Sequence, residues 1–312
     1  MYHALIMLSV IMFGSTFALK DVYRRQRGGG LKISLEFSLI GAVAGLVVLT
    51  AINGFSLQLT WFSLLMASLV SLNSLAISFC SFKALGTINL SVYSLFSMLG
   101  GMLLPFLQGI LFFHEEFTVS KAVCLAFIGA SLLLTLKKGE TKKSGRIYYV
   151  LVFIFNGMSG VLAKIFQAAP TAWKTMPSGQ LVTATGYSVL SALTTLVLTG
   201  VLLLTLFRGK PYEQEQTRRG IVIGAVIGLV SGPINRLANW ILQLSLDFVE
   251  TSVQYPMVTG GTIIVSTVIC FFTKSRPTAR EIISVALAFI GLSALFILPT
   301  FLPAWDMTIF KI

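Results

Sequence analysis

The sequence predicts an all-α polytopic membrane protein with about ten transmembrane helices, arranged as two inverted five-helix repeats. Three observations predict this fold: a charge-poor composition, a succession of apolar segments of spanning length, and a duplicated set of motifs. Of the 312 residues, 55% are hydrophobic and only 11% are charged, whereas a soluble domain carries roughly a quarter charged residues. With a mean hydropathy of +0.88, the folded chain is expected to lie in lipid.

The apolar segments follow one another along the chain with short connections. A helix needs roughly 20 mostly apolar residues to cross the hydrocarbon core. The segments that meet this requirement are 3–20, 33–53, 60–82, 90–113, 119–137, 146–167, 181–207, 219–245, 252–273 and 279–300. The first lacks the basic region of a signal peptide, so we expect a permanent span. The sequence predicts a first repeat at 1–137, a second at 146–300 and a short tail at 301–312.

The distribution of charge predicts the orientation. Basic residues gather in the connections that follow every second segment, from the first onward. They include Lys20, Arg24, Arg25, Arg27, Lys32, Lys137, Lys138, Lys142, Lys143, Arg146, Arg208, Lys210, Arg218, Arg219, Lys274, Arg276 and Arg280. Basic loops stay cytoplasmic, so both termini should face outward from the cell membrane. The net charge of +12 is therefore a topology signal. It favours contact with anionic lipid headgroups in the bilayer and not with nucleic acid.

An internal repeat relates the two halves of the chain. The stretch 125–131 (LAFIGAS) recurs as 287–293 (LAFIGLS). Other pairs in the same order are Ser15 with Ser159, Lys20 with Lys164, Leu69-Val70-Ser71 with Leu229-Val230-Ser231, and Gly100-Gly101 with Gly260-Gly261. Each copy holds an odd number of segments, so the copies must be inverted in the membrane. The acidic junction 114–118 (HEEFT) accordingly aligns with the basic junction 274–278 (KSRPT), as the positive-inside rule requires.

These motifs resemble the EamA-like branch of the drug/metabolite transporter superfamily. The residues that carry the resemblance are Phe13–Lys20, Ala84–Ser97, His114–Thr118, Gly129, Ser252-Val253, Tyr255-Pro256 and Gly291. The resemblance implies a ten-helix transporter of small molecules. It also implies a central cavity lined by the first, third, fourth, sixth, eighth and ninth segments.

Arg236 is the strongest candidate for binding a substrate. It lies within the segment 219–245, roughly 6 Å from the midplane at 1.5 Å per residue. A cation at that depth is costly unless it faces a wet cavity or a partner. Gly232-Pro233 should kink the same helix, as at the midplane sites of transporters. We predict that Arg236 binds a carboxylate or phosphate with its planar fork of donors; the alternative is a tether between helices.

Other polar and aromatic residues of the cavity-lining segments complete the predicted site. The substrate-binding set is Ser15, Asn73, Tyr93, Ser97, Asn156, Asn235, Arg236, Asn239, Trp240 and Tyr255. Lys20 and Lys164 end equivalent helices, where the helix dipole and the interface favour a cation. Glu36 is expected to snorkel to the interface. No carboxylate lies at the centre of a span, which argues against proton coupling and leaves facilitated diffusion or exchange.

The predicted function is alternating-access transport of a small metabolite, with an anionic or zwitterionic amino-acid-like or organic-acid-like compound favoured by Arg236. The transporter would be an exporter, an exchanger or a facilitator. Multidrug or cation efflux is an alternative, given the aromatic content. A further alternative is an intramembrane serine hydrolase, because Gly157-Met158-Ser159-Gly160 matches a GxSG motif. Neither histidine is expected at the depth of Ser159, so the sequence predicts no enzyme. It predicts no cofactor or metal, and either a monomer or a homodimer.

Overall fold

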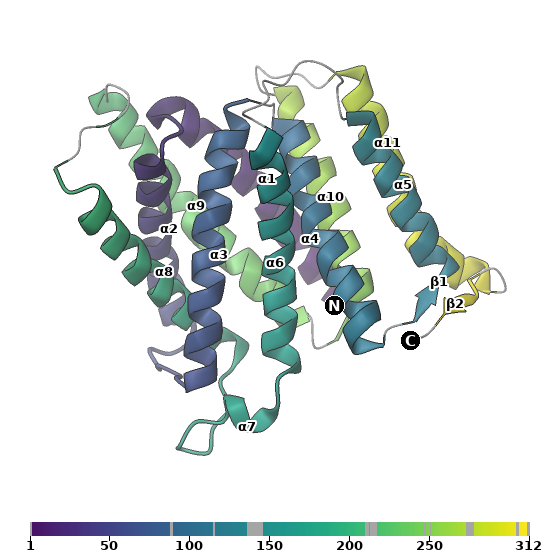
Figure 1. Cartoon of the computed structure of the whole chain (residues 1–312), viewed down its shortest axis with the longest axis horizontal. Helices are drawn as coiled ribbons and strands as arrows, with labels where there is room; N and C mark the ends of the chain where they lie inside the picture. The colour runs from purple at the N-terminus through teal and green to yellow at the C-terminus, as the bar shows by residue number, and fades with distance from the viewer. Residues whose placement is uncertain are drawn as a thin grey trace.

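The computed structural model describes residues 2–87, 90–114, 116–135, 146–209, 212, 217–245, 248–249, 251–272, 278–303 and 306–310. They form a bundle of long α-helices (Figure 1). These are α1 (Tyr2–Arg27), α2 (Leu31–Ile52), α3 (Trp61–Leu85), α4 (Leu90–Phe113), α5 (Val119–Thr135), α6 (Arg146–Ala168), α8 (Ala184–Leu206), α9 (Arg218–Ser245), α10 (Thr251–Phe272) and α11 (Ala279–Phe301). A single turn, α7 (Thr171–Lys174), precedes α8.

Seven helices in the described part of the chain are long and apolar enough to cross a membrane, namely α1, α2, α3, α4, α6, α8 and α9. The helix ends match the predicted segment ends within a few residues, except in α1. That helix continues to Arg27 because Asp21 pairs along its surface with Arg24 at 3.2 Å and with Arg25 at 2.7 Å. The predicted tail contributes a strand, β2 (Thr308–Phe310), which pairs antiparallel with β1 (Phe117–Thr118).

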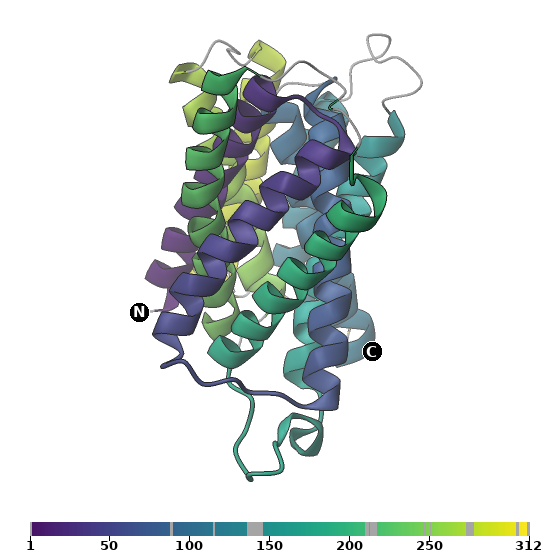
Figure 2. The same ribbon diagram turned by 90° about the vertical axis from the view of Figure 1, so that its left-hand side faces the viewer.

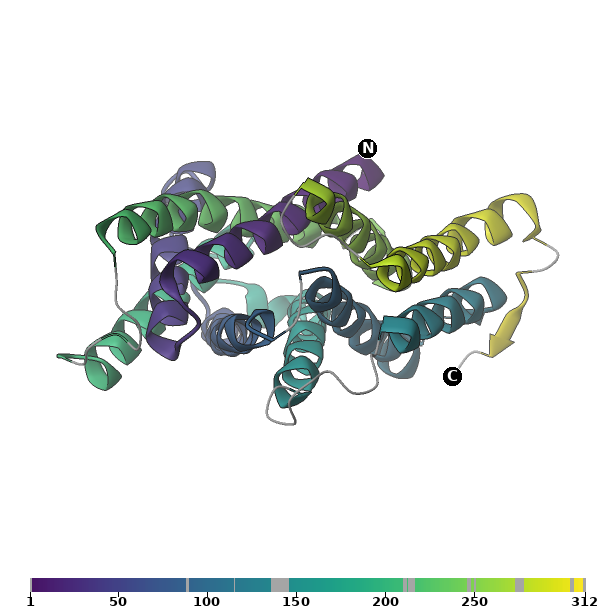
Figure 3. The same cartoon turned by 90° about the horizontal axis from the view of Figure 1, so that it is seen from above.

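The helices form two rows when the bundle is seen from above (Figure 3). One row contains α9, α1, α10 and α11, and the other contains α3, α6, α4 and α5. Helices α2 and α8 pack on each other and close one side, as Figure 2 shows. At the opposite edge, α5 and α11 form a pair that touches the rest of the bundle through α4 and α10. The two rows thus enclose the middle of the molecule.

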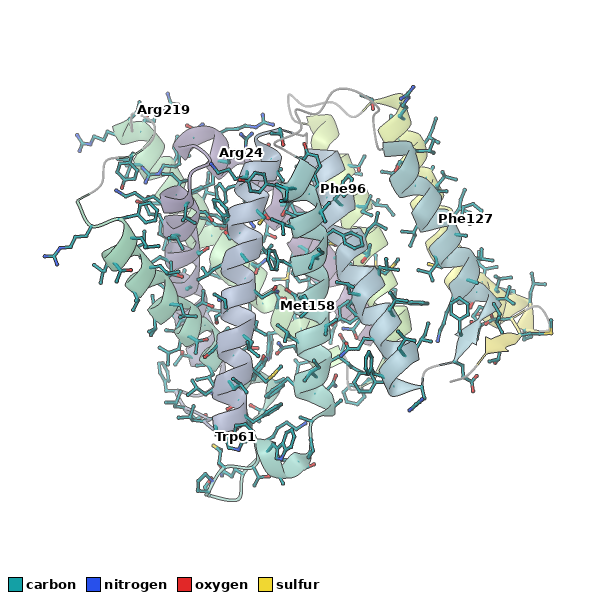
Figure 4. The ribbon with its side chains drawn as sticks, in the orientation of Figure 1. Arg24, Trp61, Phe96, Phe127, Met158 and Arg219 are labelled. Carbon is teal, nitrogen blue, oxygen red and sulfur yellow. The ribbon has the colours of Figure 1, made fainter. Side chains whose placement is uncertain are left out.

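The two ends of the bundle differ in chemistry (Figure 4). We call one the basic end, because the last turn of α1 and the starts of α2 and α9 bring cations there; Arg24 and Arg219 mark it in Figure 4. We call the other the α7 end, where Trp61 lies with its ring centroid 6.0 Å from that of Trp173 in α7. Tryptophan favours the membrane–water interface, so the direction from the basic end to the α7 end, along which the helices run, lies across the bilayer (Figure 4).

Small residues let the helix backbones approach closely. At the crossing of α2 and α9, Gly41 faces Gly232, and a Cβ on Gly232 would collide with the Gly41 backbone. At the crossing of α4 and α6, a Cβ on Gly100 would collide with the backbone of Phe153. Lipid tails are as apolar as the side chains, so the hydrophobic effect does not drive helices together within the membrane. Close van der Waals packing of this kind therefore stabilises their association.

Replacing Gly232 with alanine should therefore lower the melting temperature of the purified protein in detergent. The added Cβ overpacks the crossing, which costs about 1–3 kcal/mol. The matched control is Gly200→Ala in α8, because a Cβ there meets nothing within 4 Å and alanine favours the helix. Equal melting temperatures for the two variants would show that the α2–α9 crossing does not require a glycine at position 232.

Candidate functional site

A central cavity of about 250 Å³ lies between the two rows of helices. Residues from α1, α2, α3, α4, α6, α8, α9 and α10 line it. At the α7 end the lining reaches Tyr187, near the start of α8, and Gln243, near the end of α9. Its wall is mostly apolar, with hydroxyl and amide groups placed among the apolar side chains, as in pockets that bind small molecules.

The charge on the cavity wall has one sign. Lys20 and Arg236 line the cavity, and among the described lining residues there is no aspartate or glutamate. Lys20 was expected to lie at the interface, so its place in the cavity corrects that expectation. Its Nζ lies 5.9 Å from the centroid of the Phe37 ring, a contact that stabilises an ammonium group only weakly. The cavity therefore carries an excess of positive charge.

Arg236 is held by neutral groups only, as far as the described residues show. Its Nη1 donates to Ser191 Oγ at 3.2 Å, and its Nη2 donates to Thr195 Oγ1 at 2.8 Å. Both hydroxyls lie one turn apart on α8. Hydroxyls orient a guanidinium without neutralising it, so the charge remains available to an anion.

The structure brings most of the predicted site residues to one cavity. The lining includes Tyr93, Ser97, Asn156, Asn235, Arg236, Asn239 and Tyr255. Three predicted residues lie elsewhere. Ser15 donates to the carbonyl of Ile11 in its own helix at 2.8 Å. Asn73 ties α3 to α6, donating to Phe155 O and to Ser159 Oγ, both at 2.9 Å. Trp240 donates to Thr185 Oγ1 at 3.0 Å and packs beside Leu49 and Val189.

Sequence reasoning missed the contribution of α8. Hydroxyl residues recur along this helix at three- and four-residue intervals, at Ser188, Ser191, Thr195 and Thr199. That spacing puts them on one face, and Ser188, Ser191 and Thr195 line the cavity. The pattern was visible in the sequence, but serine and threonine in membrane helices more often join neighbouring helices. Only the structure places this face opposite Arg236.

Three aromatic rings separate the cavity from the basic end; we call them the ring triad. Tyr23, Phe37 and Phe82 contact one another with ring centroids 4.8, 5.6 and 5.9 Å apart. Phe37 lines the central cavity, whereas Phe82 lines a second cavity nearer the basic end. Beside the triad, Arg27 pairs with Glu36, which also accepts from the Tyr212 hydroxyl at 2.8 Å. Glu36, expected to snorkel, thus helps to close this end.

Ser159 has no neighbouring base among the described residues. Its hydroxyl interacts with the Phe155 carbonyl at 3.5 Å and accepts from the Asn73 amide at 2.9 Å. An amide does not remove a proton from a serine, so these contacts form no nucleophilic pair. Among the described residues, no three metal-binding side chains lie close together.

The fold and the cavity together define the class: this is an α-helical, multi-pass membrane protein with a positively charged cavity in its interior. Its fold is similar to that of solved structures, of which 28 chains match. One is a crystal structure described only as that of a protein, with a TM-score of 0.61, 16% sequence identity, and coverage of 94% of this chain and 97% of the other. At 16% sequence identity, the match shows a shared fold alone. No protein-family model and no curated protein matches the sequence.

Cysteine in place of Gln243 should react readily with a water-soluble maleimide when the protein is embedded in nanodiscs. The residue lines the part of the cavity that reaches the α7 end. Water that enters there can hydrate the reactive thiolate form of the cysteine. Cysteine in place of Ser245, fully buried in the same helix, should react more slowly by about tenfold or more. The parent protein, which keeps Cys80, Cys124 and Cys270, is labelled in parallel to give the background rate; Cys80 and Cys124 are buried. Equal rates in both variants would show that the cavity does not reach this end.

Proposed function

We propose that the protein is a transporter of a small anionic or zwitterionic metabolite that works by alternating access. The observation that carries the proposal is the central cavity with Lys20 and Arg236 in its wall and no acidic group among its described lining residues. A buried cation is expensive in the bilayer. Two cations around one cavity are best explained by a ligand that neutralises them.

The geometry of Arg236 suits a carboxylate or another planar anion. Its two terminal nitrogens are already directed by Ser191 and Thr195, so little side-chain freedom is lost when a ligand binds. The neutral hydroxyl partners can exchange for a charged acceptor, because a charge-assisted hydrogen bond is roughly twice as strong as a neutral one. Lys20, on the neighbouring helix α1 of the same row, would hold a second oxygen or the other end of the substrate.

The arrangement of helix contacts supports two inverted repeats and ten spans. If α1 to α5 correspond in order to α6, α8, α9, α10 and α11, each of the extensive contacts between helices has a counterpart. The contact of α1 with α9 corresponds to that of α6 with α3, and the contact of α4 with α6 to that of α10 with α1. The contact of α2 with α9 corresponds to that of α8 with α3. Inverted repeats of this kind exchange the access of a shared midplane site between two faces.

The ring triad suits the role of a closed gate in this mechanism. The cavity reaches the α7 end, and the triad, with Arg27 and Glu36 behind it, lies across the path to the basic end. In the alternating state, the last turn of α1 and the first turns of α2 would have to separate from the end of α3. By the positive-inside rule the basic end is cytoplasmic, so we place both termini outside the cell membrane. The conformation seen in the structure, with the cavity reaching the α7 end, would therefore be outward-facing.

The other functions considered have weaker support. Aromatic residues such as Phe17 and Tyr93 line the cavity and could contact a cation, but the two charged groups that line it, Lys20 and Arg236, would repel one. A hydrolase at Ser159 would need a base, and the described partners of that residue are an amide and a carbonyl. The EamA-like resemblance agrees with a transporter that acts as a monomer or a homodimer, without a cofactor.

Lys20→Gln and Arg236→Gln should each weaken the binding of the substrate anion. Losing a hydrogen bond to a charged group costs about 1.5–3 kcal/mol, which corresponds to roughly a 10- to 150-fold rise in Kd. The matched control is Lys164→Gln: Lys164 is the counterpart of Lys20 in the internal repeat, but its Nζ lies 5.2 Å from the Phe113 ring and it does not line the cavity.

The measurement is the rise in melting temperature caused by dicarboxylates, acidic amino acids, neutral amino acids and lipophilic cations, because a ligand of the folded state stabilises it. Ligands found in this way are then tested for uptake into proteoliposomes. Stabilisation by cations that persists in Arg236→Gln would refute the anion proposal and make Arg236 structural.

A further inference from the structure

A second cavity, of about 320 Å³, lies at the basic end, on the far side of the ring triad from the central cavity. We call it the basic pocket. The last turn of α1, the turn into α2 and the last turn of α3 form its walls, with Phe207 and Tyr212 beside them. Four basic residues line it: Arg24, Arg27, Lys32 and Lys83. The central site uses none of them.

Positive charge exceeds negative charge around this pocket in the described structure. Asp21 is already shared between Arg24 and Arg25, and Glu36 pairs with Arg27. Lys32 lies over the Tyr212 ring at 3.8 Å. Lys83 has no ion pair with a described residue; its Nζ lies 5.9 Å from the Phe79 ring centroid. Lys83 thus brings to the pocket a positive charge that no described carboxylate neutralises, and an anionic ligand would suit it.

The backbone adds donors to the same pocket. Gly28, Gly29 and Gly30 all line it, and they lead directly into α2. The first N–H groups of a helix have no partner within it, and Gly30, at the N-cap, offers no side chain to satisfy them. The first turn of α2 contains no acidic residue. The Gly28 N–H already donates to the Arg24 carbonyl at 2.8 Å, so Gly29, Gly30 and the first turn of α2 supply the donors that suit the oxygens of an anion.

The shape of this turn depends on glycine. Gly28 has a φ of +98°, which favours glycine. A Cβ on Gly29 would lie 3.3 Å from the Phe82 carbonyl oxygen in α3. The glycines therefore bring the turn against the end of α3 and leave its backbone uncovered, so the donors of α1, α2 and α3 converge on one space.

Basic residues in the last turns of α1 and α3 interact favourably with the helix dipoles, but that effect needs neither a cavity nor a glycine turn. A bound acceptor explains all of these features together.

From these features we infer that the basic pocket binds a phosphate group, carried either by a soluble phosphate compound or by the headgroup of an anionic phospholipid. A phosphate offers several strong acceptor oxygens to the arginine forks, the lysines and the backbone N–H groups at once. The site lies outside the central cavity, so the inference does not rest on the proposed transport function. A ligand there would join α1, α2 and α3 and stabilise the folded chain.

The test is the thermal unfolding of the purified full-length protein. Inorganic phosphate is compared with chloride at equal ionic strength in detergent, and phosphatidic acid with phosphatidylcholine in nanodiscs. We expect phosphate or phosphatidic acid to raise the melting temperature by about 2–4 °C. The rise should vanish in the double variant Arg24→Gln/Lys83→Gln. It should persist in Arg25→Gln, a matched control that pairs with Asp21 at 2.7 Å but does not line the pocket.

The remaining outcomes each decide a question. A rise with phosphatidic acid alone supports the inference and identifies the lipid headgroup as the source, whereas a rise with inorganic phosphate supports a soluble ligand. Persistence of the rise in Arg236→Gln separates the basic pocket from the central cavity. If the double variant does not fold, Lys32→Gln should reduce the rise. The inference is overturned if neither phosphate source stabilises the protein, or if the rise is unchanged in the folded pocket variants.

Discussion

The close crossing of α2 and α9 at Gly41 and Gly232 is the contact on which the central site depends. One turn further along both helices, Gly45 faces Arg236, and a Cβ on Gly45 would lie 2.6 Å from Arg236 Cγ. The missing side chains therefore make room for the arginine stem between the two helices. The stem leaves this gap toward α8, where Ser191 and Thr195 receive the guanidinium. A larger residue at any of these glycines would move the only cation of α9 that lies deep in the bundle.

Lipid imposes the second condition, that polar groups be satisfied inside the protein. Around Arg236 the hydroxyls of α8 meet this condition with help from α3: Ser71 donates to the Ser191 carbonyl at 3.0 Å, and Thr195 donates to Ser71 Oγ at 2.9 Å. This network holds the acceptors of the guanidinium in place. It contains no carboxylate among its described members, although one would stabilise the cation far better. The arrangement thus orients the charge and leaves it uncompensated, which is the condition that a binding site needs and a structural tether does not.

Much of the fold was predictable because membrane helices carry strong local signals. Segment limits follow from length and hydropathy, and the ends of α4 coincide with the predicted ones. Arg236 was predictable because a charge in a span is conspicuous. Lys20 was misplaced because a lysine near a helix end has two equally good environments, and α1 continues beyond it to Arg27. Asn73 and Asn156 look alike in the sequence, and each joins two helices, but only Asn156 also lines the cavity. Which neighbour a polar residue contacts depends on how its helix is rotated about its own axis. The sequence of a single, mostly apolar helix contains little information about that rotation.

The ring triad gives the two cavities a common wall. Phe37 belongs to the central cavity and Phe82 to the basic pocket, and their centroids are 5.6 Å apart. Opening the central cavity toward the basic end would require these rings to separate, and with them the ends of α1, α2 and α3 that form the basic pocket. A ligand shifts such an equilibrium only by its difference in affinity for the two states. A phosphate group that contacts all three helices binds the closed conformation more tightly, because it can make all of its contacts only while the three helix ends are together. If the central cavity opens in alternation and the basic pocket binds phosphate, occupancy of the pocket and access from the basic end oppose each other, and by linkage a substrate that opens this end weakens the binding of phosphate.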